Sequence, residues 1–145
     1  MTSKVILLVE DNQDDEELAL LALKKGQVAN EVIVARDGEE ALDYLFKRGP
    51  FADRNLESLP QMVLLDLKLP KIDGLEVLKQ IRENVTTRRL PVVILTSSRE
   101  EEDLFRGYDL GANSYVRKPV DFNQFVEAVR QLEMYWLVLN EPPPH

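Results

Sequence analysis

The chain has 145 residues, of which 44% are hydrophobic and 30% are charged, and it contains no cysteine. This length is typical of one domain with a sizeable core, and the lack of cysteine excludes disulfides and thiolate chemistry. The net charge of −8 argues against a nucleic-acid partner, and no apolar run is long enough for a signal peptide or a membrane span, so we expect a cytoplasmic protein.

Five short apolar runs predict β-strands, and segments with apolar residues at three- and four-residue spacing predict helices between them. In chain order, the expected elements are a strand over 5–9, a helix over 14–26, a strand over 31–35, a helix over 38–48, a strand over 62–65, a helix over 74–84, a strand over 92–95, a helix over 99–110, a strand over 114–116 and a helix over 121–138. This alternation predicts a doubly wound α/β domain with one parallel sheet. The charge-flanked strand 31–35 is expected at an edge.

Small and polar residues at the element boundaries support these expectations. Gly26, Gly49 and Gly111 fall where the first, second and fourth helices are expected to end. Aspartate or asparagine precedes four of the helices, as expected of N-caps, at Asp11-Asn12, Asp37, Asp73 and Asp121. The connection over 49–60 is long, and it either contacts a partner or is a tolerated surface insertion.

Four of the five predicted strands are followed by residues suited to binding Mg²⁺ or phosphate. Because parallel strands place their carboxyl ends at one edge of the sheet, these side chains are expected to meet there; they are Glu10, Asp11, Asp66, Thr96 and Lys118. Three clustered acids repel one another, which a divalent cation relieves. Taken singly, each residue also fits a helix cap, a turn or an ordinary strand exit. The metal-site interpretation requires Asp66 to be reachable by solvent.

The order and context of these residues closely resemble the receiver domain of bacterial two-component response regulators. The resemblance spans residues of about 4–138 and is carried by Glu10-Asp11, Asp66 followed by Leu67-Lys68-Leu69-Pro70, Asp73-Gly74, Thr96-Ser97, Gly111-Ala112, Tyr115 and Lys118-Pro119. It implies a flavodoxin-like fold with five helices and the strand order 2-1-3-4-5. It also implies a receiver domain over 1–138, followed by a tail over 139–145 with no output domain.

The same resemblance implies roles for individual residues. Asp66 is expected to accept a phosphoryl group from a sensor histidine kinase, and Lys118 and Thr96 to bind its oxygens. Mg²⁺ is expected on Asp11, Asp66 and the backbone carbonyl of Lys68, with Glu10 completing the metal site by holding a metal-bound water. Thr96 and Tyr115 are expected to switch a surface formed by the fourth helix, fifth strand and fifth helix. The Lys118-Pro119 peptide is expected to be cis, and the Lys68 side chain either pairs with the phosphoryl group or shields it.

Two apolar segments suggest protein partners. The first helix carries Leu18 and Leu20 to Leu23, which form either a wide buried face or a surface for the kinase. Apolar residues continue from Met134 to Leu139, so this segment either folds back on its own domain or forms a homodimer, with Tyr135, Trp136 and Leu139 as the candidate contacts. The aromatic C-terminal end and the long loop also resemble receivers that partner phytochromes.

Three other functions fit parts of the pattern. A phosphorylation-independent interaction module is an alternative that the intact set of site residues disfavours, because such a module does not need them. An aspartyl phosphatase is disfavoured, because the familiar version places a second acid two residues after its nucleophile and Gln13 stands there. A flavin binder is disfavoured because three carboxylates repel a flavin phosphate. We therefore expect a signalling switch rather than an enzyme.

Overall fold

The computed structural model describes residues 5–26, 28, 30–52, 59–97, 99–106 and 111–131, with backbone only over 103–106. In chain order its elements are β1 (Val5–Val9), α1 (Gln13–Lys25), β2 (Glu31–Ala35), α2 (Gly38–Phe46), the 3₁₀ turn η1 (Gly49–Phe51), β3 (Met62–Asp66), α3 (Gly74–Glu83), β4 (Val92–Thr96), α4 (Arg99–Arg106), β5 (Ser114–Arg117) and α5 (Phe122–Gln131). Within this part of the chain, no helix has the length and apolar character needed to cross a bilayer.

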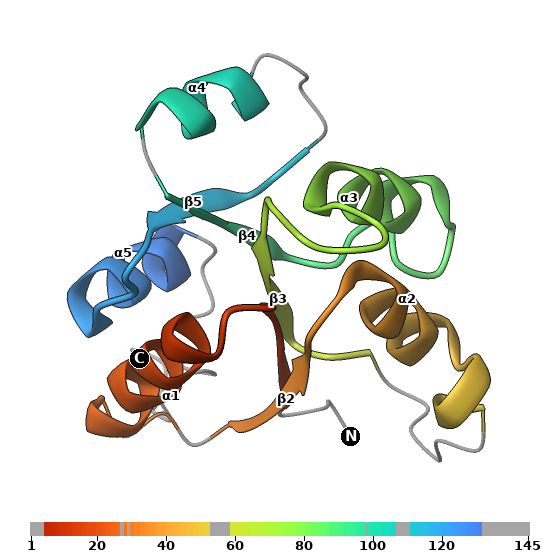
Figure 1. Cartoon of the computed structure of the whole chain (residues 1–145), viewed down its shortest axis with the longest axis horizontal. Helices are drawn as coiled ribbons and strands as arrows, with labels where there is room; N and C mark the ends of the chain where they lie inside the picture. The colour runs from red at the N-terminus through yellow and green to blue at the C-terminus, as the bar shows by residue number, and fades with distance from the viewer. Residues whose placement is uncertain are drawn as a thin grey trace, which may run out of the picture.

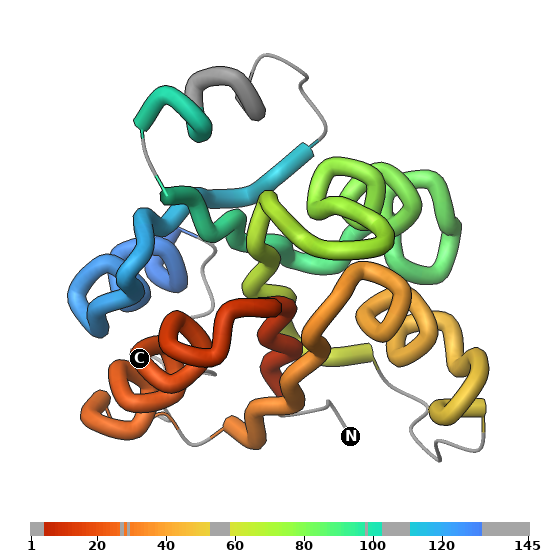
Figure 2. The backbone as a smooth tube through the Cα atoms, in the orientation of Figure 1, coloured from red at the N-terminus to blue at the C-terminus, as the bar shows by residue number. Residues whose placement is uncertain are grey.

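All five strands are parallel and lie in the order β2-β1-β3-β4-β5, so the expected fold is confirmed. After each of β1 to β4 the chain passes through a helix before it returns to the sheet (Figure 2). β2 lies at one edge, as its charged flanks predict. The order reverses at β1, whose neighbours are β2 and β3, and this places the ends of β1 and β3 side by side at the switch point.

Helices cover both faces of the sheet, with α1 and α5 on one side and α2 and α3 on the other (Figure 1). The strands are buried throughout at β1, β3 and β4, and alternate residues supply two separate cores. Leu7, Val63 and Ile94 pack on the α2 and α3 side. Ile6, Leu64 and Leu95 pack with Phe125 on the α1 and α5 side. This explains why the strands are continuously apolar rather than alternating.

The predicted N-caps are confirmed in the structure. Asn12, Asp37, Asp73 and Asp121 each accept a hydrogen bond from the backbone N–H three residues later, at 2.7–2.9 Å. Gly26 caps the end of α1, also as predicted. The expectation that Gly49 ends the second helix is wrong, because α2 ends at Phe46 and Lys47 adopts the left-handed conformation with φ of 55°. The Gly111 prediction concerns 107–110, which lie outside the described residues.

Part of the long connection packs against the domain. η1 brings Phe51 against the ring of Tyr44 in an edge-on contact with 5.3 Å between ring centroids. The rest of this connection over 53–58 lies outside the described residues, as do positions 132–138 of the predicted fifth helix and the dimer candidates Tyr135, Trp136 and Leu139.

Candidate functional site

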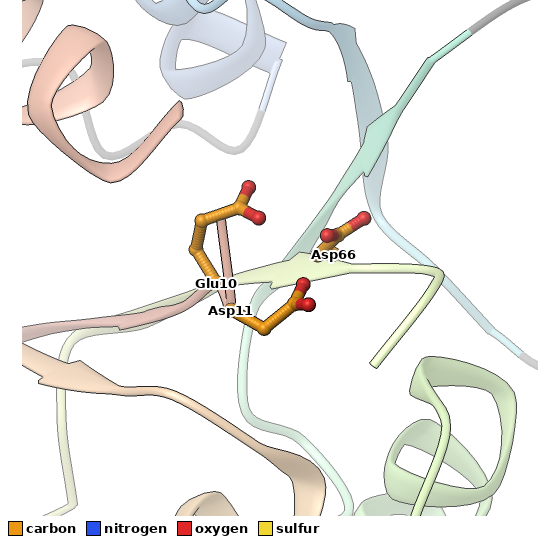
Figure 3. Close-up of side chains that lie close together, drawn as sticks. All are labelled: Glu10, Asp11 and Asp66. Atoms are coloured by element: carbon orange, nitrogen blue, oxygen red, sulfur yellow. The ribbon is translucent and has the colours of Figure 1, made fainter. Parts of the chain in front are cut away.

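Three carboxylates gather where β1 and β3 end. Glu10 and Asp11 follow β1, and Asp66 is the last residue of β3. One oxygen from each of these side chains lies within 4.8 Å of the others, and Figure 3 shows the three side chains around the two strand ends. The cap of α1 is Asn12 rather than Asp11, so capping does not occupy the Asp11 carboxylate. Glu10 and Asp66 are buried and Asp11 is exposed.

Lys118 brings its ammonium group to this cluster from the end of β5. Its Nζ lies 3.1 Å from Oδ2 of Asp66, 3.2 Å from Oε1 of Glu10 and 3.0 Å from Oδ2 of Asp15. The three N–H donors of an ammonium thus meet three different carboxylates. The Lys118-Pro119 peptide is cis, as the resemblance implies.

Asp15 is the site residue that sequence reasoning missed. It lies in the first turn of α1, where an acid is ordinarily explained by the positive end of the helix dipole. The signal in the sequence is its position, because Asp15 stands three residues after the N-cap Asn12, in the turn of α1 that begins beside the end of β1.

The electrostatics of the cluster raise the pKa of Glu10 and keep Lys118 charged. Burial, followed by hydrogen bonding to Asp66 and repulsion from it, raises the pKa of Glu10 to about 7. Burial alone would lower the pKa of Lys118, but the carboxylates of Asp66, Asp15 and Glu10 outweigh it and raise that pKa, so the ammonium stays charged. The cluster therefore carries excess negative charge, which favours a cation.

The expectation that Asp66 is open to solvent is wrong for this structure, because its side chain is only 3% exposed. The Lys118 ammonium lies 3.1 Å from its Oδ2, and the Glu10 carboxylate is a hydrogen-bond neighbour. The cluster still opens to solvent on the Asp11 side, since Asp11 is exposed and its oxygen lies within 4.8 Å of the other two.

Thr96 supplies a hydroxyl at the end of the neighbouring strand. The residue is fully buried, and its Oγ1 has no hydrogen-bond partner among the described residues. A buried hydroxyl without a partner is costly, so a bound group with acceptor oxygens would satisfy it. Tyr115 on β5 is half-buried and packs against the α2 and α3 core, opposite Ile94 in the register.

The loop after β3 lies close to Asp66. The backbone N–H of Lys68 donates to Oδ1 of Asp66 at 3.3 Å, and its side chain is 80% exposed. Gly74, the first residue of α3, packs directly on the main chain of the same loop: a methyl group there would overlap the carbonyl oxygen of Asp66. Glycine is required here because the helix approaches the strand end so closely.

The donor set fits a hard divalent cation. Mg²⁺ binds carboxylate oxygens and retains several waters, and three oxygens from Glu10, Asp11 and Asp66 with one solvent-facing side meet that need. These three candidate ligands are all carboxylates, whereas softer metals prefer nitrogen and sulfur.

Comparison with known proteins identifies the family. Residues 6–130 match the response regulator receiver domain family, and the chain belongs to it. Response regulator Rcp1 of Synechocystis sp. is 40% identical over 134 residues, which cover 92% of this chain and 89% of Rcp1. A structure of the Mn²⁺-bound form of Rcp1 has a TM-score of 0.71 at 39% identity and covers 92% of this chain and 94% of its own.

Two further solved structures are similar to this chain. The bacteriophytochrome response regulator AtBRR has a TM-score of 0.90 at 57% identity, covering 97% of this chain and all of AtBRR. The phosphorylated cyanobacterial phytochrome response regulator RcpA has a TM-score of 0.73 at 43% identity, covering 94% of this chain and 95% of RcpA. The chain is thus a receiver domain whose relatives include phytochrome-associated response regulators.

Proposed function

We propose that the protein is a phosphoacceptor switch in which Asp66 receives a phosphoryl group from a sensor histidine kinase. The observation that carries this proposal is the convergence of Glu10, Asp11 and Asp66 with the Lys118 ammonium at one strand edge. The unpartnered Thr96 hydroxyl supports it, because a phosphoryl group supplies the acceptor that Oγ1 lacks. The similarity to RcpA, which is known in a phosphorylated form, gives further support.

In the proposed reaction an oxygen of Asp66 forms a bond to phosphorus while the bond from phosphorus to the kinase imidazole breaks. The imidazole nitrogen keeps the electron pair and is protonated. Lys118 leaves Asp66 to pair with a phosphoryl oxygen, and the Thr96 hydroxyl donates to another. Mg²⁺ held by Glu10, Asp11 and Asp66, with the Lys68 carbonyl, would neutralise the oxygens that carry the charge. The Mn²⁺-bound form of Rcp1 supports a divalent cation in this family.

The proposed partner surfaces lie on two sides of the domain. Leu18 and Leu21 on α1 are 43% and 47% exposed, which supports α1 as the kinase docking face. The surface proposed to switch with Thr96 and Tyr115 includes α4, β5 and α5, and Tyr115 lines a hollow there with Gln124 and Gln131. The similarity to AtBRR and RcpA supports a phytochrome as the kinase, and a homodimer through this surface is proposed from the sequence.

Intact mass measurement after incubation with acetyl phosphate and Mg²⁺ tests the proposal. We expect one phosphoryl group on the wild-type protein, none on Asp66→Asn, and none when a chelator removes the metal. Asp73→Asn is the matched control, because asparagine caps a helix as well as aspartate does and the adduct should be unchanged. No adduct on the wild type would favour a passive interaction module, and turnover of many phosphates per protein would favour a phosphatase.

A further inference from the structure

Glu101, in the first turn of α4, connects the two loops that follow Asp66 and Thr96. Its Oε1 accepts a hydrogen bond from the backbone N–H of Ser97 at 3.3 Å. Its Oε2 lies 3.4 Å from Nζ of Lys68. Ser97 directly follows Thr96 at the end of β4, and Lys68 stands two residues after Asp66 at the end of β3. The Glu101 carboxylate therefore binds one donor near each of these two strand ends.

The two ends of the Glu101–Lys68 pair differ in their freedom to move. The Glu101 side chain is 13% exposed, whereas the Lys68 side chain is 80% exposed. The main chain of Lys68 is already held beside the site, because its N–H donates to Oδ1 of Asp66. Its flexible four-carbon side chain can therefore exchange Glu101 for a group carried by Asp66 without moving the backbone.

A phosphoryl group on Asp66 would bring nearly two negative charges and three acceptor oxygens to this edge. It offers the same kind of contact as the Glu101 carboxylate, with more charge. We propose that Glu101 is an internal competitor of the phosphoryl group for Lys68 and Ser97, so that phosphorylation of Asp66 releases the contacts of Glu101. This inference rests on the function proposed above and identifies a positioning residue for it.

The affinity for beryllofluoride, a stable stand-in for a phosphoryl group, tests this competition in the presence of Mg²⁺. Glu101→Gln keeps the size of the side chain but releases Lys68, so we expect its Kd to fall about threefold, as the strength of an exposed ion pair suggests. Glu100→Gln is the matched control: this neighbouring residue is exposed, and the same charge is removed. In a Lys68→Gln background, Glu101→Gln should no longer tighten binding.

The amide signal of Ser97 in a ¹H–¹⁵N NMR spectrum gives a second readout that needs no variant. In the wild-type protein it should shift when beryllofluoride binds, because Glu101 releases this N–H. Each of three results would overturn the inference. The Ser97 signal could stay unmoved, or the Kd values of Glu101→Gln and Glu100→Gln could be equal. Glu101→Gln could also tighten beryllofluoride binding by the same factor in the Lys68→Gln background as in the wild type. A wild-type protein that neither binds beryllofluoride nor accepts a phosphoryl group would instead refute the proposed function.

Discussion

Lys118 is held as closely by Asp15 as by Asp66, with Nζ–Oδ2 distances of 3.0 Å and 3.1 Å. The lysine side chain is 11% exposed and that of Asp15 is 27% exposed, so this pair is partly shielded from solvent. The first turn of α1 is thereby tied to the end of β5 through the centre of the site.

Replacing Asp15 tests the strength of this pair. We expect Asp15→Asn to lower the free energy of unfolding by about 1 kcal/mol, because Lys118 loses a charged hydrogen-bond partner. Asp14→Asn removes the same charge from the same helix turn, at an exposed position, and should cost less. Urea unfolding without metal measures both. Equal losses in the two variants would show that only the helix dipole is involved.

The raised pKa of Glu10 predicts how the stability of the metal-free protein depends on pH. Because its pKa is about 7 in the folded state against 4.5 in the unfolded chain, the folded protein binds the proton more tightly between these values. The free energy of unfolding should therefore fall as pH rises from about 4.5 to about 7, by on the order of 2–3 kcal/mol. Glu10→Gln should flatten this dependence in urea titrations with chelator; an unchanged slope would contradict the assignment to Glu10.

Gly74→Ala should disturb the site through the main chain of Asp66 and Leu67. A methyl group at this position overlaps the carbonyl oxygen of Asp66 and lies 2.8 Å from the Cα of Leu67, so the loop after β3 must shift. We expect a loss of about 1–3 kcal/mol in stability and slower incorporation of a phosphoryl group from acetyl phosphate. Lys79→Ala, at an exposed position on the same helix, is the control and should leave both unchanged. If Gly74→Ala incorporates the phosphoryl group as fast as the wild-type protein does, Asp66 tolerates the shift of the loop.

Arg82 donates hydrogen bonds to the residues that directly precede β5, Gly111 and Asn113. Its guanidinium donates to the carbonyl oxygens of Gly111 at 2.7 and 3.0 Å, Leu90 at 2.7 Å and Arg88 at 3.2 Å, and to the Asn113 side chain at 3.0 Å. Lysine cannot reproduce this fork, so Arg82→Lys should lower the free energy of unfolding by about 2–3 kcal/mol. Arg88→Lys, with an exposed side chain, should change it by less than about 0.5 kcal/mol in the same denaturation experiment.

The elements of the fold could be predicted from the sequence because strands that are buried on both faces of the sheet appear as continuous apolar runs. β1, β3 and β4 are apolar at every core position, and each predicted strand agrees with the observed one to within one residue. The end of α2 could not be predicted, because Lys47 rather than Gly49 adopts the left-handed conformation. The strand order came from the resemblance to receiver domains and not from the apolar pattern.

The sequence by itself determined which side chains lie at the functional edge of the sheet, because the residues that follow parallel strands all lie at the carboxyl edge. Only the tertiary structure decided how those side chains pair. The contacts of Lys118 with Asp15 and of Lys68 with Glu101 join residues far apart in the chain, and the burial of Asp66 results from Lys118 and Glu10 closing over it. Such contacts depend on distances between helices and strands that no local spacing encodes.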